Sequence, residues 1–265
     1  REIVLPAACV HHEHAAFNFE IWEFMTRRSS LSYELRYHLY SEMRMSRCWI
    51  SGFLGVNHAH VMWCTRKILR RLSKDNASEK AFEISRVTHS NGLSVFEVAL
   101  EQVCGYENMI TPLIDAFKVM TPLCVDQLMY YCLEYMAKRD SSKLKKDGTN
   151  IASWFNNMCQ FTSLLVQSSY AKLDLSGILN YLYARLLSNE VLYVILFREL
   201  FSVMAGISVQ ESLSDRECMA FQAFPALRDY VFRQAKGSDF AALESEKKSR
   251  TKLFESLKEN ELVIQ

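Results

Sequence analysis

Two histidine clusters have residue types that can bind a metal. They are His11-His12-Glu13-His14 and His58-Ala59-His60. Imidazoles and carboxylates are common zinc ligands, but protein zinc sites usually show spacings such as H-E-x-x-H or paired C-x-x-C. Neither spacing occurs in this sequence. We therefore interpret both clusters as solvated histidine-bearing stretches, with a metal site as the less favoured alternative.

Motifs for other site chemistry are also missing from the sequence. There is no G-x-x-x-x-G-K or G-x-G-x-x-G loop to hold phosphates before a helix, and no nucleophile elbow of the serine hydrolases. A Cys–His nucleophilic pair stays open, because such partners meet in space rather than in sequence. We predict no catalytic, cofactor-binding or metal residues, no small-molecule substrate and no enzymatic activity.

The eight cysteines show irregular spacing and no C-x-x-C pair, and several lie among apolar residues of helical pattern. They are Cys9, Cys48, Cys64, Cys104, Cys124, Cys132, Cys159 and Cys218. A chain of this length with few turns is a poor disulfide scaffold. We expect reduced, mostly buried thiols in a cytosolic or nuclear protein.

The clearest charge pattern is a basic ridge. Arg66, Arg70 and Lys74 are spaced i, i+4, i+8 on an expected helix over residues 57–74, above a stripe of apolar residues. Such a ridge fits nucleic-acid phosphates or an acidic partner surface. The plainer interpretation, the charged face of an ordinary surface helix, is somewhat favoured.

A polar insert, KRDSSKLKKDGTN, covers residues 138–150. Its lysines, Lys143, Lys145 and Lys146, form a second basic patch, for which a solvated loop is an equally good interpretation. A third basic run at residues 247–252 is interleaved with glutamates and is interpreted as a solvated helix face.

The elements that must position these residues are helices. Only 8 glycines and 4 prolines occur in 265 residues, too few for the many turns of sandwiches, barrels or doubly wound sheets. Apolar residues recur with a period close to 3.6 along most of the chain. The pattern predicts an all-α protein, an α-solenoid of antiparallel helix pairs similar to HEAT repeats. The expected helices cover residues 17–29, 31–47, 57–74, 77–89, 93–104, 107–119, 122–138, 150–168, 174–187, 190–205, 214–223, 226–236 and 240–259.

Capping signals support these boundaries. Thr121-Pro122 predicts a helix start, and Gly206 predicts a helix end. The other expected N-terminal signals are Asn76 with Glu79, Ser94 with Glu97, Ser214 with Glu217, Asp174 and Asn189.

Net charge and hydropathy limit the partners. The 31 Lys+Arg and 30 Asp+Glu give a formal charge of +1, so no global field draws the chain to nucleic acid or membrane. We find no signal peptide and no long uncharged apolar run, and we expect no membrane partner. Because the chain begins with Arg1 and its last helical pattern runs nearly to Gln265, we expect a segment of something larger.

Several stretches together resemble the central region of the large second subunit of the THO complex. They are residues 31–40 (LSYELRYHLY), 66–91 (RKILRRLSKDNASEKAFEISRVTHSN), 106–123 (YENMITPLIDAFKVMTPL), 145–154 (KKDGTNIASW), 173–182 (LDLSGILNYL), 203–214 (VMAGISVQESLS) and 247–257. The resemblance covers residues 17–262 in the right order, whereas residues 48–62 depart from the family pattern.

The resemblance implies a MIF4G-like helical domain. On this basis we expect N-terminal helices over residues 1–56, the central MIF4G-like domain over 57–210, and C-terminal helices that continue the scaffold over 211–265. The family works in the nucleus, in the TREX assembly that couples transcription to mRNA packaging and export. Its middle domain docks and stimulates a DEAD-box RNA helicase ATPase.

The resemblance also suggests partners and contact residues. The expected partners are other THO subunits and a DEAD-box RNA helicase, with RNA as a further candidate. The candidate contact residues, chosen for charge and expected exposure, are Arg66, Arg70, Lys74, Lys145, Lys146, Asp147 and Thr149. Direct RNA binding by the basic ridge, or a purely structural spacer, are the alternatives.

Overall fold

The computed structural model describes residues 15–28, 31–45, 52–138, 143–145, 147–169, 171–206 and 240–259. The helices in this part of the chain are α2 (Ala15–Glu23), α3 (Tyr33–Met45), α4 (Gly52–Leu69), α5 (Ala77–Gly105), α6 (Ile110–Phe117), α7 (Pro122–Lys138), α8 (Ser153–Ser169), α9 (Ser176–Leu187), α10 (Val194–Ala205) and α13 (Phe240–Glu259). A π-helical turn (Phe24–Arg28) extends α2, and short 3-10 turns (Glu107–Met109 and Val191–Tyr193) precede α6 and α10. Within these ranges there are no strands, and the predicted all-α class is confirmed.

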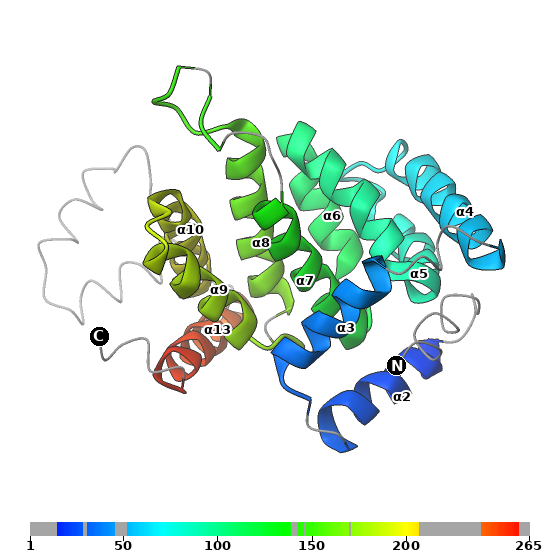
Figure 1. Cartoon of the computed structure of the whole chain (residues 1–265), viewed down its shortest axis with the longest axis horizontal. Helices are drawn as coiled ribbons and strands as arrows, with labels where there is room; N and C mark the ends of the chain where they lie inside the picture. The colour runs from blue at the N-terminus through cyan, green and yellow to red at the C-terminus, as the bar shows by residue number, and fades with distance from the viewer. Residues whose placement is uncertain are drawn as a thin grey trace, which may run out of the picture.

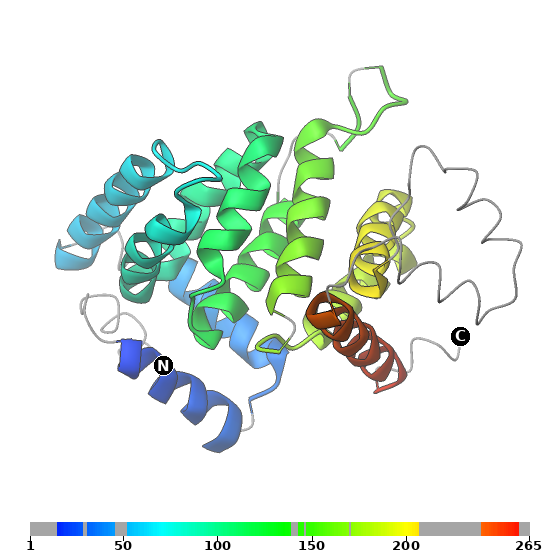
Figure 2. The same cartoon turned by 180° about the vertical axis from the view of Figure 1, so that it is seen from behind.

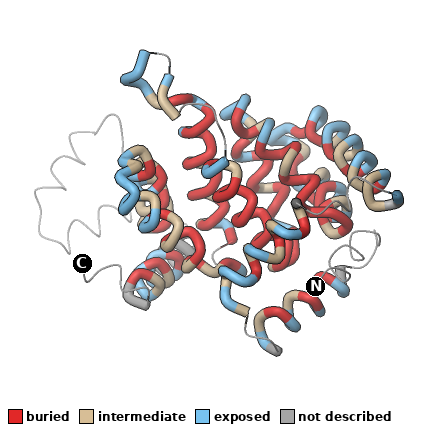
Figure 3. The backbone as a smooth tube through the Cα atoms, in the orientation of Figure 1, coloured by how far each residue is buried: buried red, intermediate tan, exposed pale blue. Residues whose placement is uncertain are grey.

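Helices α4 to α10 stack side by side in roughly chain order, and α2 and α3 lie along one edge of this stack, where both contact α7 (Figures 1 and 2). Helix α5 packs against α4, α6, α7 and α8, and α8 packs in turn against α10, which contacts α13. The buried residues are concentrated in α5–α8, in the middle of the stack (Figure 3). This arrangement confirms the α-solenoid. None of the helices described is both long and apolar enough to cross a membrane.

Helix α5 joins two of the predicted helices end to end. Its backbone leaves helical geometry at Asn91 (φ −148°, ψ 81°), where the sequence predicts a break between residues 89 and 93. Asn91 Oδ1 accepts a hydrogen bond from the Ser94 backbone N–H at 3.3 Å, so Asn91 caps the second half of α5. The prediction of Ser94 as the cap is wrong, because the Ser94 Oγ instead lies 2.6 Å from His58 Nδ1 of α4.

Other predicted helix ends have mixed outcomes. Helix α7 begins at Pro122, and Gly206 ends α10 in the left-handed conformation (φ 67°), as predicted. Asp174 Oδ1 accepts the backbone N–H of Ser176 at 3.0 Å, at the start of α9. Asn189, predicted to cap the next helix, instead adopts a left-handed conformation (φ 62°) just after α9. The predicted cap Ser214 and the helices over 214–223 and 226–236 lie outside the described residues.

A buried ion pair joins distant parts of the stack. The Arg36 guanidinium of α3 donates to both carboxylate oxygens of Asp126 in α7, at 2.9 and 3.2 Å. It also donates to Asp174 at 3.3 Å and to the Leu31 carbonyl at 2.9 Å. The Tyr40 hydroxyl donates to Asp126 Oδ2 at 2.9 Å. Burial raises the pKa of the Tyr40 hydroxyl well above its ordinary value, so it stays a donor.

Helix α9 approaches α3 closely at a glycine. A Cβ added to Gly177 would lie 2.7 Å from the Tyr37 hydroxyl and 3.1 Å from two of its ring carbons. The Tyr37 ring also packs 5.5 Å from the ring of Tyr130 in α7. Because the aromatic ring is held between helices, it has little room to move away from a larger residue.

Replacing Arg36 with Met should strongly destabilise the fold, because it leaves the Asp126 carboxylate buried without its cation. Removal of one partner of a buried pair costs about 3–5 kcal/mol. The free energy of unfolding from urea titrations followed by circular dichroism measures the effect. The matched control is Lys118→Met, which breaks the exposed pair of Lys118 with Asp115 and should cost less than about 1 kcal/mol. Equal losses in the two variants would contradict the prediction.

Gly177→Ala should destabilise the protein by about 1–3 kcal/mol, the usual cost of overpacking. The matched control is Gly105→Ala at the end of α5, where an added Cβ meets nothing within 4 Å. That control should be neutral or slightly stabilising, because alanine favours a helix over glycine. Thermal unfolding of both variants compares them, and an unchanged melting temperature for Gly177→Ala would show that Tyr37 moves aside.

Candidate functional site

The basic ridge lies where α4 ends. Arg66 is in the last turn of α4, Arg70 directly follows the helix, and Lys74 lies in the turn before α5. All three residues are exposed. Arg66 and Arg70 keep the predicted spacing, since the Arg70 backbone N–H still bonds to the Arg66 carbonyl at 3.1 Å.

The prediction that one helix continues to residue 74 is wrong. After Leu69 the backbone tightens, with bonds from Arg71 N–H to the Ile68 carbonyl and from Leu72 N–H to the Leu69 carbonyl. The Asn76 side chain donates to the Arg71 carbonyl at 2.7 Å and accepts from the Ser73 N–H at 2.8 Å. Asn76 was predicted to cap the next helix, but its amide holds the preceding turn instead.

The described part of the polar insert forms a small hairpin. Leu144 and Ile151 make an antiparallel bridge, and the Lys145 N–H bonds to the Asn150 carbonyl at 2.7 Å. Gly148 supplies the left-handed residue of the turn (φ 71°). Lys145, Asp147 and Thr149 are exposed, whereas Lys146 lies outside the described residues.

Asp147 holds the turn of this hairpin. Its Oδ1 accepts the backbone N–H groups of Thr149 and Asn150, both at 3.1 Å, and its Oδ2 accepts from the Asn150 side chain at 2.5 Å. These hydrogen bonds, those of Asn150 first, hold the pKa of the Asp147 carboxyl below its ordinary value. As a contact residue, Asp147 would therefore act chiefly by shaping the turn that presents Lys145 and Thr149.

The base of the insert is tied to the stack. Lys143 Nζ pairs with Glu190 at 2.5 Å and lies 4.5 Å from the centre of the Tyr193 ring. Glu190 also accepts from Arg185 of α9 at 2.8 Å. Trp154 is buried and Ile151 packs against the core, so these two residues also anchor the insert. Lys143 therefore serves as an anchor, and Lys145 is the exposed lysine of the described hairpin.

The structure does not bring the two candidate groups together. The hairpin projects from the start of α8, whereas α4 and the ridge lie at the far end of the stack, with α5–α7 between them (Figures 1 and 2). A single partner can contact both groups only by spanning the intervening helices.

The Cys–His pair left open by the sequence has one candidate, in α4: Cys64 Sγ lies 3.5 Å from His60 Nε2. No group of three or more metal-ligand side chains occurs among the residues described, and His11–His14 lie outside them. Cys104, Cys124, Cys132 and Cys159 are buried free thiols, and Cys64 is a half-buried one. Burial raises the pKa of the Cys124 thiol to about 11, which keeps it protonated near neutral pH.

Comparison with known proteins gives one consistent result. A family model described as Thoc2, a transcription- and export-related complex subunit, matches residues 84–159. THO complex subunit 2 of Arabidopsis thaliana is 30% identical over 97% of this chain, and that of Homo sapiens is 26% identical over 99%. The yeast Saccharomyces cerevisiae protein of the same name is 21% identical over 87% of the chain.

The predicted resemblance to the second subunit of the THO complex is confirmed. The chain spans 14 to 16% of the length of these relatives. The matched segment, residues 84–159, begins in α5 and runs through α6 and α7 into α8, the most buried part of the stack. The hairpin of the insert lies within this matched segment, whereas Arg66, Arg70 and Lys74 precede it.

One charged cluster fixes the chain just before the insert. Glu134 of α7 accepts hydrogen bonds from Lys138 of the same helix and from Arg44 of α3. The Arg44 guanidinium also lies over the Tyr131 ring, 4.6 Å from its centre. Burial favours a raised pKa for the Glu134 carboxyl, but Lys138 and Arg44 outweigh it, so the pKa lies below its usual value of 4.5.

The Glu134 cluster should make stability depend on pH. Because its pKa is lower in the folded state than in the unfolded state, the ionised carboxylate stabilises the fold above the unfolded pKa. That stabilisation is lost as the pH falls through the folded pKa. Urea unfolding between about pH 3 and pH 6 should show Glu134→Gln less stable than the parent near pH 6, with the difference shrinking towards acid pH. The matched control is Glu101→Gln, at an exposed position of α5. A difference that does not change with pH would contradict this assignment.

Proposed function

We propose that this chain is a non-catalytic helical scaffold segment of a nuclear mRNA-packaging and export complex of the THO/TREX kind. The similarity to THO complex subunit 2 over nearly the whole chain carries the proposal. Other subunits of that complex are then its expected partners. A stack of helices of this kind is the type of architecture that presents extended surfaces to partners.

The more specific part of the proposal is that the segment docks a DEAD-box RNA helicase and stimulates its ATPase. Such an ATPase has two lobes that open and close during turnover. A scaffold accelerates turnover only if it binds one arrangement of the lobes better than the others, because equal affinity for all states shifts nothing. We propose that a half-open arrangement is the favoured state.

The separation of the two candidate groups suits a two-lobed partner. Arg66, Arg70 and Lys74 lie at the α4 end of the stack, and Lys145 and Thr149 project from the hairpin before α8. Each group would meet one lobe, and the rigid helices between them would set the distance between the lobes. Their positive charge would favour acidic surfaces on the helicase and would speed its association.

RNA-dependent ATP turnover of the cognate helicase, measured at fixed salt while the chain is titrated, tests the proposal. Saturable stimulation is expected. The pair Arg66→Glu and Arg70→Glu should raise the half-saturating concentration by about tenfold, equivalent to about 1.4 kcal/mol of binding free energy. Arg198→Glu, a single charge reversal at an exposed position of α10 where the arginine pairs with Glu199, is the control, and it is compared with Arg66→Glu and Arg70→Glu made singly.

Two other outcomes would support a different function for this segment. If the ridge variants lose binding to a single-stranded RNA oligonucleotide but keep helicase stimulation, the basic ridge is an RNA contact. Its affinity should then fall by roughly 0.7 log units per log of salt for each phosphate neutralised. If neither helicase nor RNA binds, the segment is a structural spacer of the scaffold.

A further inference from the structure

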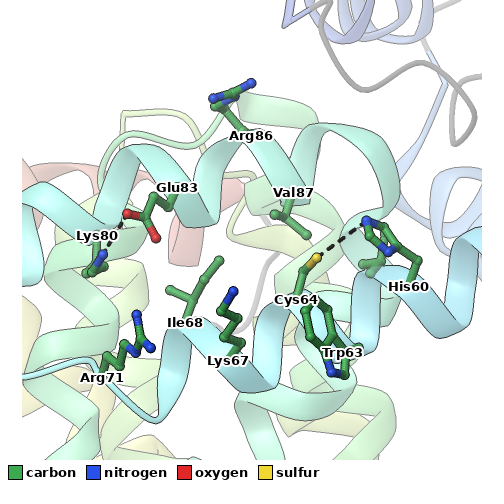
Figure 4. Close-up of a pocket in the computed structure, with 11 residues that line it drawn as sticks. His60, Trp63, Cys64, Lys67, Ile68, Arg71, Lys80, Glu83, Arg86 and Val87 are labelled. Atoms are coloured by element: carbon green, nitrogen blue, oxygen red, sulfur yellow. Dashed lines mark hydrogen bonds and ion pairs between the residues drawn. The ribbon is translucent and has the colours of Figure 1, made fainter.

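A groove runs between α4 and the first half of α5, and its lining does not include Arg66, Arg70 or Lys74 of the basic ridge (Figure 4). Its volume is about 610 Å³. Lys67, Ile68 and Arg71 point from the α4 side towards α5, and Glu83 and Val87 point back from α5 (Figure 4). The groove therefore divides the basic run of α4 in two, with Lys67 and Arg71 in the groove and Arg66 and Arg70 outside it.

The floor of the groove is apolar. Val61 is buried, and Ile68 and Val87 are half-buried aliphatic residues that line it. Trp63 extends this apolar surface and is unusually exposed, at 59%. An exposed large apolar side chain beside a concave apolar surface is typical of a binding groove rather than of plain protein surface.

The rim of the groove is positively charged. Lys67, Arg71, Lys80 and Arg86 line it, against the single carboxylate of Glu83. Glu83 is engaged by Lys80 at 2.6 Å. Lys67, Arg71 and Arg86 are exposed, and among the residues described no carboxylate forms an ion pair with any of them. The groove therefore combines an apolar floor with an excess of about three positive charges.

The surroundings of Trp63 favour a peptide over a nucleic acid as the occupant. Single-stranded nucleic acid is bound by stacking of its bases on open aromatic faces. The ammonium of Lys67 lies over the Trp63 ring, 5.2 Å from its centre, and the His60 ring stacks on Trp63 at 6.3 Å. The indole thus has the Lys67 ammonium and the His60 ring where a base would stack, and the aliphatic floor offers no stacking surface.

We propose that this groove binds an acidic peptide segment of a partner protein that carries an apolar anchor residue. The anchor would fill the floor formed by Val61, Ile68 and Val87, beside Trp63. Aspartates or glutamates on either side of the anchor would pair with Lys67 and Arg71. This site does not depend on docking of a helicase, because it uses neither the basic ridge nor the insert.

Fluorescence anisotropy tests the proposal with a short labelled peptide of aspartate and glutamate that has a Phe-Leu pair at its centre. We expect saturable binding that weakens as salt is raised, because the rim charges are exposed. The pair Lys67→Glu and Arg71→Glu should weaken binding by at least about tenfold. Trp63→Ala should weaken it as well, and so should replacement of the peptide's Phe-Leu pair by Ser-Ser.

The matched control is the pair Arg66→Glu and Arg70→Glu, which reverses the same charges on the neighbouring face. At high salt, which screens long-range electrostatic effects, this control should change the affinity for the peptide by less than about twofold. Equal losses in the two double variants would overturn the proposal, since binding would then follow net charge alone. Binding of an unlabelled oligouridylate to the groove residues in preference to the peptide would also overturn it.

All substituted side chains are exposed, so the variants should remain folded, which circular dichroism checks. Arg86→Glu, on the α5 side, provides an independent test of the same rim if either double variant unfolds. The helicase assay is a separate measurement. If the groove variants lose peptide binding but stimulate the helicase normally, the proposed helicase contact still stands. If the ridge variants lose helicase stimulation but bind the peptide normally, the proposed peptide site still stands.

Discussion

The architecture depends on one buried cation. The Arg36 guanidinium lies 5.5 Å from the centre of the Trp22 ring of α2 and binds Asp126 of α7 and Asp174 before α9. It thus connects four segments with a single side chain whose exposure is 5%. Taking two charges out of water is costly, and the cost is offset only where geometry is good and the remaining donors are satisfied. Here the bidentate contact, the Leu31 carbonyl and the Tyr40 hydroxyl meet that condition, and this fixes how the N-terminal helices lie on the core.

Sequence periodicity predicted best where one helix has one buried face and clear ends. The bounds of α7 follow from Thr121-Pro122 and a regular apolar stripe, and the prediction of a helix over residues 240–259 matches α13. The predictions of helix caps failed where the side chain makes a tertiary or loop contact that no local sequence pattern encodes. Ser94 bonds to His58 across two helices, and Asn76 bonds back to the preceding turn. The groove was missed because Trp63 and Lys67 appear in sequence as part of one basic helix, and only packing against α5 separates them from Arg66.

The charges of the chain are divided by their roles rather than by their positions in sequence. Lys143, Arg185 and Arg44 hold elements together through paired carboxylates and aromatic rings. Arg66, Arg70 and Lys145 are exposed and are the cations on which the proposed docking depends. The near-zero net charge conceals this division, because a balanced total is compatible with local surfaces of one sign. In a scaffold, local surfaces of one sign can provide separate binding sites for different partners. The balanced total charge at the same time limits non-specific binding of polyanions to the whole segment.

From the sequence separations spanned by Arg36 we expect an order of folding. Its contacts close loops of 90 residues to Asp126 and 138 residues to Asp174. Contacts between α5 and its neighbours α4 and α6 are far more local and form at a lower entropic cost. At a synthesis rate of about 5–20 residues per second, α3 leaves the ribosome on the order of ten seconds before Asp174 does. During that interval the unpaired guanidinium keeps α3 hydrated, so the N-terminal helices should join the stack only after their anionic partners have been made.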